Sequence, residues 1–529
     1  MKKTINYILA AFSAVVLVSS CNLDLFPYGS VAYDEEGALF HNAQELGYLE
    51  NGLYSSYRSG FYGEYSITEE VMTDGFNASA DFGNNYGGVH RVDSDLNPGD
   101  YYIRDFWSNR YSAIKNYNVL IKGVETLPEE YKALGAQAQL VKGEAYFFRA
   151  SAYLDLVRRY AAPYDAATAS AENSGVPLVL VYDQNEKPAR ATVQEVYDQI
   201  KKDLDSAYVN LHTVSGTTVK AASLSKYKFN ITVDAVNALY ARYFLDVKDY
   251  TNAAAKAYEV IGSKAGYALS SSVKEFVSEY LNDEGTEAIV QLYTSIAEEG
   301  SGVNSVYTSM ESSPSDVKDN SRGRYFNKPY FFPSQKLLDL YDAEDLRLAC
   351  WFTINGKNNL TDEVYPTYII NSFKYDVTIF TKYLGNPKLQ LTSSAVLNAR
   401  QYAKPVMLGE MYLIAAEANF RNGDEPAALN ALNALQEKRG ANLSYNVSEA
   451  VLYNEWFKET IGEGLRLSTV KRFGKGYEKR YNQPAAVGLI MDGDSYQSKS
   501  LDPSDYHLNW PIPTNDIQTN PNLVQNPGY

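Results

Sequence analysis

The stretch from Ala136 to Tyr160, AQAQLVKGEAYFFRASAYLDLVRRY, runs for 25 residues without a proline. Its apolar and small residues fall on two interleaved helical series, one beginning at Leu140 and the other at Val141, which together cover most of the circumference. A helix at the surface needs only one apolar stripe. The pattern therefore predicts a central helix, packed between neighbours, that ends before Pro163 because proline forbids another turn.

Threonine three residues before glutamate is the spacing of a capping box, in which the two side chains satisfy the first free N–H groups of a helix. Thr126 and Glu129 have this spacing upstream of the central helix, and Thr192 and Glu195 have it further along. We predict that the first box opens the central helix. The second should open a helix that runs to Ala207.

Two pairs of predicted helices are joined by short turns, at residues 233–246 with 251–262 and at residues 405–421 with 425–438. Alanines recur in them at spacings of twelve and seven residues, which is typical of tetratricopeptide-like pairs because small side chains let two helices approach closely. Alanine-rich hairpins without repeat character are the alternative. Together with the preceding helices, the pairs predict a mainly α-helical superhelix.

Two regions interrupt the helical pattern. Residues 59–105 are rich in Gly, Asn, Asp and aromatic residues, and residues 265–400 hold many tyrosines and phenylalanines with short β-like runs at 365–370 and 377–383. Long irregular segments inside a compact protein are usually functional. Because aromatic rings mixed with polar side chains suit a surface that stacks on a polar ligand, we expect the ligand site in these regions.

The first 20 residues have the pattern of a targeting segment and are set aside from the fold. Lys2 and Lys3 precede an apolar stretch that is too short to span a bilayer comfortably. Small residues directly before Cys21 resemble the bacterial lipoprotein signal, in which cleavage leaves an acylated cysteine at the new N-terminus. An ordinary secretory signal is the alternative. Besides Cys21 the sequence has only Cys350, so an internal disulfide is not expected.

Charge and motifs argue against several classes of function. The formal net charge of −16 repels phosphate backbones, so we expect no nucleic-acid partner. The nucleophile elbow of serine hydrolases, the zinc-binding HExxH motif, the phosphate-binding loop and the dinucleotide fingerprint are absent from the sequence. The four histidines have no ligand spacing. We expect neither metal nor cofactor, and we interpret Cys350 as a core residue rather than a nucleophile.

Paired carboxylates leave one catalytic alternative open. Glu455, Glu459 and Glu463 are spaced four residues apart, so on a helix they would share one face, and a glycoside hydrolase needs two carboxyl groups at a suitable distance. Three aligned acids more often form a solvated or salt-bridged face, here with Arg466 and Arg472 nearby.

Short motifs in one recognisable order extend over nearly the whole chain, and they resemble those of the SusD/RagB family of Bacteroidetes outer-surface lipoproteins. The resemblance rests on Cys21 with residues 22–27, on Trp107, Tyr111 and Asn118, on Gly143-Glu144-Ala145 and Phe148-Arg149-Ala150, on Gly175-Val176-Pro177-Leu178, on motifs within residues 190–204, 333–347 and 413–418, on Ala241-Arg242, on Glu463-Gly464-Leu465-Arg466 and on the tail 510–529.

The resemblance implies a mainly α fold, a superhelix of about four tetratricopeptide-like helix pairs with irregular insertions and minor β elements. It also implies binding without catalysis, a lipid anchor on the outer membrane that faces the cell exterior, and a SusC-like TonB-dependent transporter over which the protein closes as a lid. The family's usual ligand is an oligosaccharide and, in the RagB branch, a peptide. Aromatic rings that cover sugar faces and polar side chains that pair with hydroxyls fit the oligosaccharide. A surface glycoside hydrolase and a lid without a ligand site are the other hypotheses.

We expect a signal peptide, a lipidated tether and a single body. The predicted boundaries are 1–20 for the signal peptide, 21–42 for the tether and 43–529 for the body, with a helical scaffold at 107–262 and 405–475, insertions at 59–105 and 265–400 and a loop-rich tail at 476–529.

The resemblance also implies where the ligand binds. In the family the site is built from the loop before the helix of Trp107 and from the insertion before the motif at 333–347, which here are residues 72–104 and 289–332. Each candidate has an alternative role as a packing aromatic or a turn residue. The glycan-binding candidates are Asp74, Asn84, Tyr86, Tyr293, Tyr307 and Tyr325.

Overall fold

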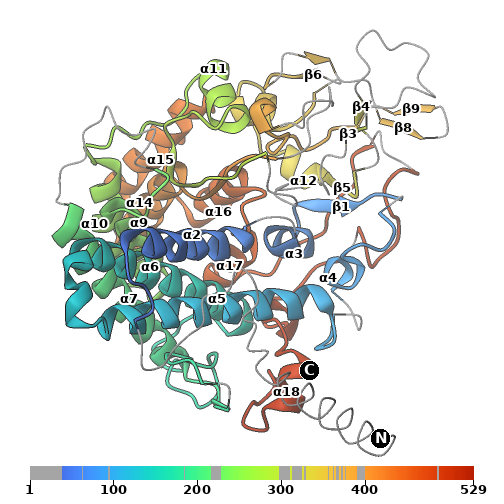
Figure 1. Cartoon of the computed structure of the whole chain (residues 1–529). Helices are drawn as coiled ribbons and strands as arrows, with labels where there is room; N and C mark the ends of the chain where they lie inside the picture. Colours follow the sequence, from blue (N-terminus) through green and yellow to red (C-terminus); the bar gives the residue numbers. More distant parts are fainter. Residues whose placement is uncertain are drawn as a thin grey trace, which may run out of the picture.

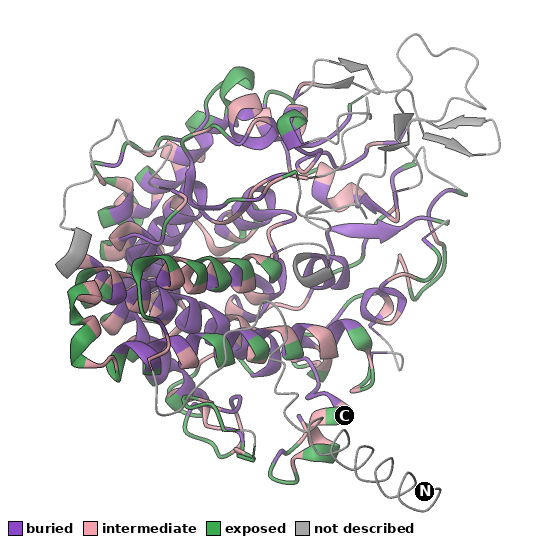
Figure 2. Ribbon diagram, in the orientation of Figure 1, coloured by how far each residue is buried: buried purple, intermediate pink, exposed green. Residues whose placement is uncertain are grey.

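The computed structural model is mainly helical, and Figure 1 shows long helices filling most of the body. Buried residues concentrate where these helices face one another (Figure 2). Among the residues described, no helix combines the length and apolarity needed to cross a membrane. The described residues are 38–61, 64–80, 82–92, 96–183, 185–215, 228–296, 310–311, 325–326, 329–354, 357–360, 363–364, 368–370, 373–375, 377–389, 400–484, 488–497 and 499–529.

Each long helix of the scaffold packs against the next one along the chain, which confirms the mainly α, tetratricopeptide-like superhelix. The first helix of the body, α2 (Ala43–Ser59), lies across α5 and α6. The scaffold series is α5 (Tyr101–Glu125), α6 (Gly135–Tyr160), α7 (Val193–Ser215), α9 (Val233–Asp246), α10 (Tyr250–Ile261), α14 (Leu408–Arg421) and α15 (Glu425–Arg439).

Shorter helices lie outside this series. They are α3 (Glu64–Met72), α4 (Gly87–Arg91), α11 (Val273–Phe276), α12 (Gln335–Leu338), α13 (Leu346–Trp351), α16 (Glu449–Thr460), α17 (Arg466–Arg472) and α18 (Thr514–Thr519).

Helix α6 is the central helix that its apolar pattern predicts. It contacts α2, α5, α7, α9 and α17, and 17 of its 26 residues are buried. Arg149 of α6 donates to Asp203 of α7 at 2.8 and 2.6 Å and to Asn118 of α5 at 2.8 Å. One buried guanidinium therefore fixes three neighbouring helices with charge-assisted hydrogen bonds.

Only one of the two predicted capping boxes exists. The Thr192 hydroxyl accepts the Glu195 N–H at 3.1 Å, and the Glu195 carboxylate accepts the Thr192 N–H at 2.8 Å, so this box opens α7 as predicted. The prediction for Thr126 is wrong because α5 is still helical there, and Thr126 is its C-terminal cap. Pro128 then ends that helix, and α6 begins after a separate 3-10 turn.

The first irregular region is more ordered than expected. It contains α3, α4 and a short strand, and α5 begins at Tyr101 rather than near Trp107. The Asp100 carboxylate accepts the N–H groups of Tyr102 and Ile103 at 2.9 and 3.2 Å, an N-cap that the sequence analysis missed. Elements this short hold too few residues to show a period.

The described strands form antiparallel pairs within the second insertion, between the two insertions, or, for β2 and β10, between the second insertion and the residues directly before α14. The predicted β-like run at 365–370 ends in a strand, at Tyr368–Ile370. The predicted run at 377–383 instead makes only an isolated bridge, between Phe380 and Phe352. The pairs are β1 (Phe76–Ala78) with β5 (Phe331–Pro333), β2 (Ala288–Leu292) with β10 (Ala403–Met407), β3 (Met310–Glu311) with β4 (Tyr325–Phe326), β6 (Lys357–Asn358) with β7 (Glu363–Val364) and β8 (Tyr368–Ile370) with β9 (Phe373–Tyr375).

The aligned acids belong to a buried ion network rather than to a solvated face. Glu459 pairs with Arg439 and with Arg347 at 2.9 Å, and Glu455 pairs with Arg347 at 2.7 Å. Burial alone would raise the pKa of Glu455, but Arg347 and Lys458 lower it to about 2. These two carboxylates therefore stay charged, and both are held in ion pairs with arginines of the fold.

Two details of the acid prediction are wrong. Helix α16 ends at Thr460, so Glu463 does not continue its face. Arg466 and Arg472 pair with other carboxylates, those of Asp74 and Glu417.

Cys350 is fully buried, and burial raises the pKa of its thiol to about 12, which confirms a core residue.

Replacing Arg439 tests how much the ion network contributes to the stability of the fold. Arg439→Met would leave Glu287 and Glu459 buried with one cationic partner fewer, so we expect the free energy of unfolding to fall by about 3–5 kcal/mol. Urea unfolding followed by circular dichroism measures the loss. Lys201→Met breaks an exposed pair with Asp205 and should cost less than about 1 kcal/mol. Equal losses in the two variants would contradict this role.

Candidate functional site

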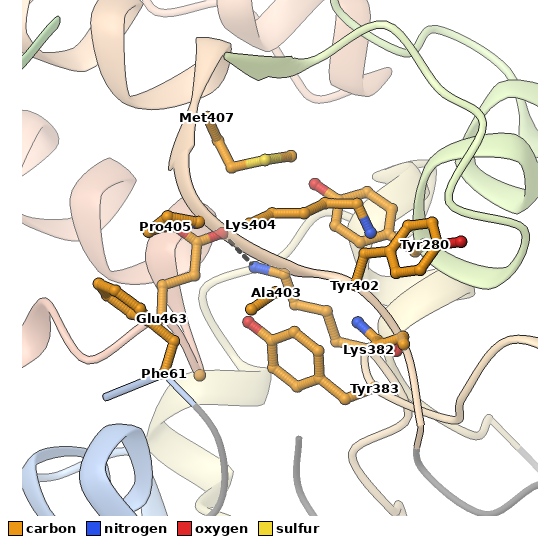
Figure 3. A pocket seen from close by; sticks show the side chains of 12 residues that line it. Phe61, Tyr280, Lys382, Tyr383, Tyr402, Ala403, Lys404, Pro405, Met407 and Glu463 are labelled. Atoms are coloured by element: carbon orange, nitrogen blue, oxygen red, sulfur yellow. Dashed lines mark hydrogen bonds and ion pairs between the residues drawn. The ribbon is translucent and has the colours of Figure 1, made fainter. Parts of the chain in front are cut away.

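A pocket opens beside β10 and is lined by several tyrosines (Figure 3). We call it the tyrosine pocket. Tyr280 comes from the π-helical turn Val277–Leu281, Tyr383 from a turn that precedes the 3-10 helix Pro387–Leu389, and Tyr402 directly precedes β10. The lining residues are Phe61, Tyr280, Lys382, Tyr383, Gln401, Tyr402, Ala403, Lys404, Pro405, Met407, Gly462 and Glu463.

The register of β2 and β10 brings a further exposed ring to the pocket. Ala403 pairs with Leu292, so the residues that flank this pair, Tyr402 and Tyr293, become neighbours. Their ring centroids are 5.5 Å apart, and Tyr293 is 58% exposed. Phe229 lies edge-on to Tyr402 at 5.4 Å. Aromatic rings therefore extend from the pocket wall to the protein surface.

Charged side chains in the pocket wall are paired with one another or with buried neighbours. Lys382 lies 2.7 Å from Glu463, the pair that the dashed line marks in Figure 3. Lys404 pairs with Asp283, which is fully buried. Burial raises the pKa of Glu463, and the charge of Lys382 opposes that shift.

A second set of polar groups lies near α4, and we call it the Asn84 cluster: Asn84, which is exposed, and Arg91 and Tyr496, which are half-buried. Arg91 donates to the Asn84 amide oxygen at 2.8 Å and to the Tyr496 hydroxyl at 3.2 Å. The ring of Phe82 packs edge-on against Tyr496 at 6.1 Å. An amide, a guanidinium and a phenol beside aromatic rings can pair with sugar hydroxyls.

The tail reaches the Asn84 cluster by strand-like pairing with the first insertion. Ser79 bridges Ile490, the N–H of Ala80 donates to the Leu489 carbonyl at 2.6 Å, and the N–H of Met491 donates to the Ala78 carbonyl at 2.8 Å. This contact sets the loop of Tyr496 beside the loop of Asn84.

Two sequence candidates lie inside the fold. Asp74 is fully buried and accepts two hydrogen bonds from Arg466 at 2.9 Å and one from Lys336 at 3.0 Å. Burial would raise the pKa of Asp74, yet Arg466 and Lys336 lower it below its ordinary value. Tyr86 is also buried and stacks on Tyr102 at 3.9 Å. Both residues support the loops rather than face a ligand.

The other candidates are separated. Asn84 and Tyr293 are exposed, the first in the Asn84 cluster and the second beside the tyrosine pocket. The backbone of Tyr325 lies in β4, opposite Glu311, and nothing is described of its side chain. Tyr307 lies outside the described residues.

Sequence reasoning missed most of the pocket and part of the cluster. Tyr402 follows the predicted insertion 265–400 by two positions, and Tyr496 lies in the loop-rich tail, where no pattern singles it out. Tyr280 and Tyr383 lie within the predicted insertion, among many aromatic residues. Only the β2–β10 pairing would have pointed to Tyr402.

Two family models together match nearly the whole described chain. One is described as "Starch-binding associating with outer membrane" and covers residues 33–258, and the other is described as "SusD family" and covers residues 274–529. The chain belongs to the SusD family. The first description associates the matched family with the outer membrane.

Individual relatives agree with this family. The chain is 36% identical over 123 residues to the Starch-binding protein SusD of Bacteroides thetaiotaomicron, an alignment that spans 23% of this chain and only 20% of that protein. It is 26% identical over 463 residues to a SusD-like protein of Formosa agariphila, covering 80% of this chain and 79% of the other.

Solved structures of the SusD superfamily share the fold. A SusD superfamily protein from Bacteroides thetaiotaomicron superposes with a TM-score of 0.69 at 22% identity, over 91% of this chain and 99% of that one. A laminarin binding SusD-like protein superposes with a TM-score of 0.68 at 22% identity, over 93% of this chain and 100% of that one.

Gly462 offers a test of the pocket wall. Its φ is +78°, and an added Cβ would lie 2.9 Å from the rings of Phe380 and Tyr383. We expect Gly462→Ala to destabilise the protein by about 2–5 kcal/mol, from backbone strain plus overpacking, and to displace Tyr383.

The control is Gly423→Ala, in the turn between α14 and α15. Its φ is +81°, but nothing lies within 4 Å of the added Cβ, so only the backbone cost of about 1–2 kcal/mol applies. Urea unfolding compares the two variants. A Gly462→Ala loss no larger than the Gly423→Ala loss would show that the wall tolerates the methyl group.

Proposed function

We propose that this chain is a cell-surface lipoprotein that captures an oligosaccharide and delivers it to a partner SusC-like TonB-dependent transporter, without catalysing a reaction. Membership of the SusD family supports binding as the function, since the matched family is described as starch-binding. A laminarin binding SusD-like protein with the same fold supports a glycan as the ligand.

The observation that carries the proposal is the tyrosine pocket. Tyr280, Tyr383 and Tyr402 line it, and Tyr293 continues the aromatic surface outward. Such rings cover the apolar faces of sugars, while hydroxyl and amide groups between them satisfy hydroxyls that would otherwise be buried unpaired. We propose that the Asn84 cluster provides a second set of contacts to the glycan.

Of the other residues that the sequence predicts as ligand contacts, two are kept in the proposal and two are not. Tyr307 and Tyr325 stay predicted ligand contacts, whereas Asp74 and Tyr86 are left out because both are buried among scaffold partners. Peptide capture, a surface glycoside hydrolase and a lid without its own site are the competing functions. Release of reducing ends from a bound polysaccharide would favour the hydrolase.

Alanine variants of the aromatic surface test glycan capture. Because Tyr402→Ala and Tyr293→Ala each remove one stacking ring, we expect each to weaken glycan binding about tenfold, or about 1.4 kcal/mol. Calorimetry with laminari-, malto- and cello-oligosaccharides measures the affinities. Tyr445→Ala, at a fully exposed position, should leave binding unchanged.

The same assay distinguishes the alternatives. A large loss in Arg91→Ala with none in Tyr402→Ala would move the site to the Asn84 cluster. Binding of peptides with no binding of any glycan would replace the proposal by peptide capture. Unchanged uptake in cells after alanine substitution at Tyr293, Tyr307 and Tyr402 would favour a structural lid.

The lipid anchor is proposed at Cys21, which lies outside the described residues. We expect Cys21→Ser to abolish labelling by a radioactive fatty acid and to release the protein from the outer-membrane fraction, because the acylated residue is lost. Cys350→Ala, which changes a buried core thiol, should keep both labelling and fractionation. Continued acylation of Cys21→Ser would contradict the anchor.

A further inference from the structure

Lys382 stands in the wall of the tyrosine pocket, but its charge is used within the wall. It donates to the Glu463 carboxylate at 2.7 Å, to the Glu459 carbonyl at 3.3 Å and to the Ile461 carbonyl at 3.2 Å. An ammonium group has three N–H donors, so these contacts occupy all of them. Its nitrogen also lies 3.9 Å from the centre of the Trp351 ring, a cation–π contact.

Lys404 is compensated in the same way. Its side chain is 6% exposed, and its partner Asp283 is fully buried. The second carboxylate oxygen of Asp283 accepts the Asn386 amide at 2.8 Å and the Tyr402 N–H at 3.1 Å. The pair is therefore locked by hydrogen bonds, and Lys404 is not available as a counter-ion for a ligand.

The remaining polar groups of the described lining are neutral. They are the phenols of Tyr280, Tyr383 and Tyr402 and the amide of Gln401. Burial raises the pKa of Tyr280 and Tyr383 well above the ordinary value, so these phenols keep their protons at neutral pH. Phenols and amides can both donate to and accept from sugar hydroxyls.

A negative ligand group would meet two penalties in this pocket. It would lose water without gaining a cation, which is costly for a charged group. The chain also carries a formal net charge of −16, whose field opposes the approach of anions.

We infer that the tyrosine pocket selects uncharged oligosaccharides over uronate-containing or sulfated ones. The inference rests on the proposed glycan binding and adds the chemical class of the sugar. The two cations of the wall thus hold the pocket in shape instead of recognising acidic sugars.

Calorimetry on the mature chain at pH 7.5 tests the selection. The neutral probes are laminari-, malto- and cello-oligosaccharides, and the acidic probes are oligogalacturonate, alginate and chondroitin sulfate oligosaccharides. We expect at least one neutral probe to bind about tenfold more tightly than every acidic one, a difference of about 1.4 kcal/mol. An acidic probe that binds as tightly as the neutral ones overturns this inference alone. Binding of no probe overturns the proposed function, and the inference with it.

Glu463→Gln tests the physical basis. The glutamine oxygen can still accept from Lys382, but the lysine charge is then uncompensated, so we expect acidic probes to gain about tenfold in affinity, and less at high salt. Glu259→Gln is the matched control: it removes the same charge from an exposed pair with Lys256, at 2.9 Å, and should change nothing. No gain in Glu463→Gln, or an equal gain in both variants, overturns the inference.

Discussion

The structure depends on the two buried carboxylates that share Arg439. The guanidinium of this α15 residue binds Glu287, directly before β2, and Glu459, near the end of α16, and it also donates to the Ser270 carbonyl at 3.0 Å. A buried guanidinium is tolerated only where such partners surround it. Its bidentate geometry therefore fixes a helix pair of the scaffold against the first strand of the large insertion.

The walls of the tyrosine pocket follow from that fixed relation. The N–H of Leu408 donates to the Glu287 carbonyl at 2.9 Å, so the residue that binds Arg439 also binds the junction between β10 and α14. The β2–β10 register then sets Tyr402 beside Tyr293, and the turn after Glu459 supplies Gly462 and Glu463. Because the charged side chains of the wall are paired, Lys382 with Glu463 and Lys404 with Asp283, they hold the aromatic side chains of the pocket in place.

Periodicity predicted the scaffold well, and α9 has the same bounds, 233–246, as the prediction. It could not predict the pocket, because strand register and a turn bring Tyr402 and Gly462 to the same pocket, and neither leaves a local pattern. Asp74 shows the reverse error. In an aromatic-rich loop it resembles a ligand contact, but its partner Arg466 is 392 positions away, and a sequence does not show that pairing. Most of the family motifs lie in the scaffold, and among the described residues that line the tyrosine pocket only Glu463 belongs to one of them.

The small sheet at the Asn84 cluster has a consequence for the order of folding. Segments 76–78, 331–333 and 489–491 lie side by side in it, although they come from the beginning, the middle and the end of the chain. The helix pairs need only contacts between neighbours in sequence, which form fast, whereas distant segments must first close long loops. We therefore expect this sheet to be completed after the scaffold that supports it, once the C-terminal segment has arrived.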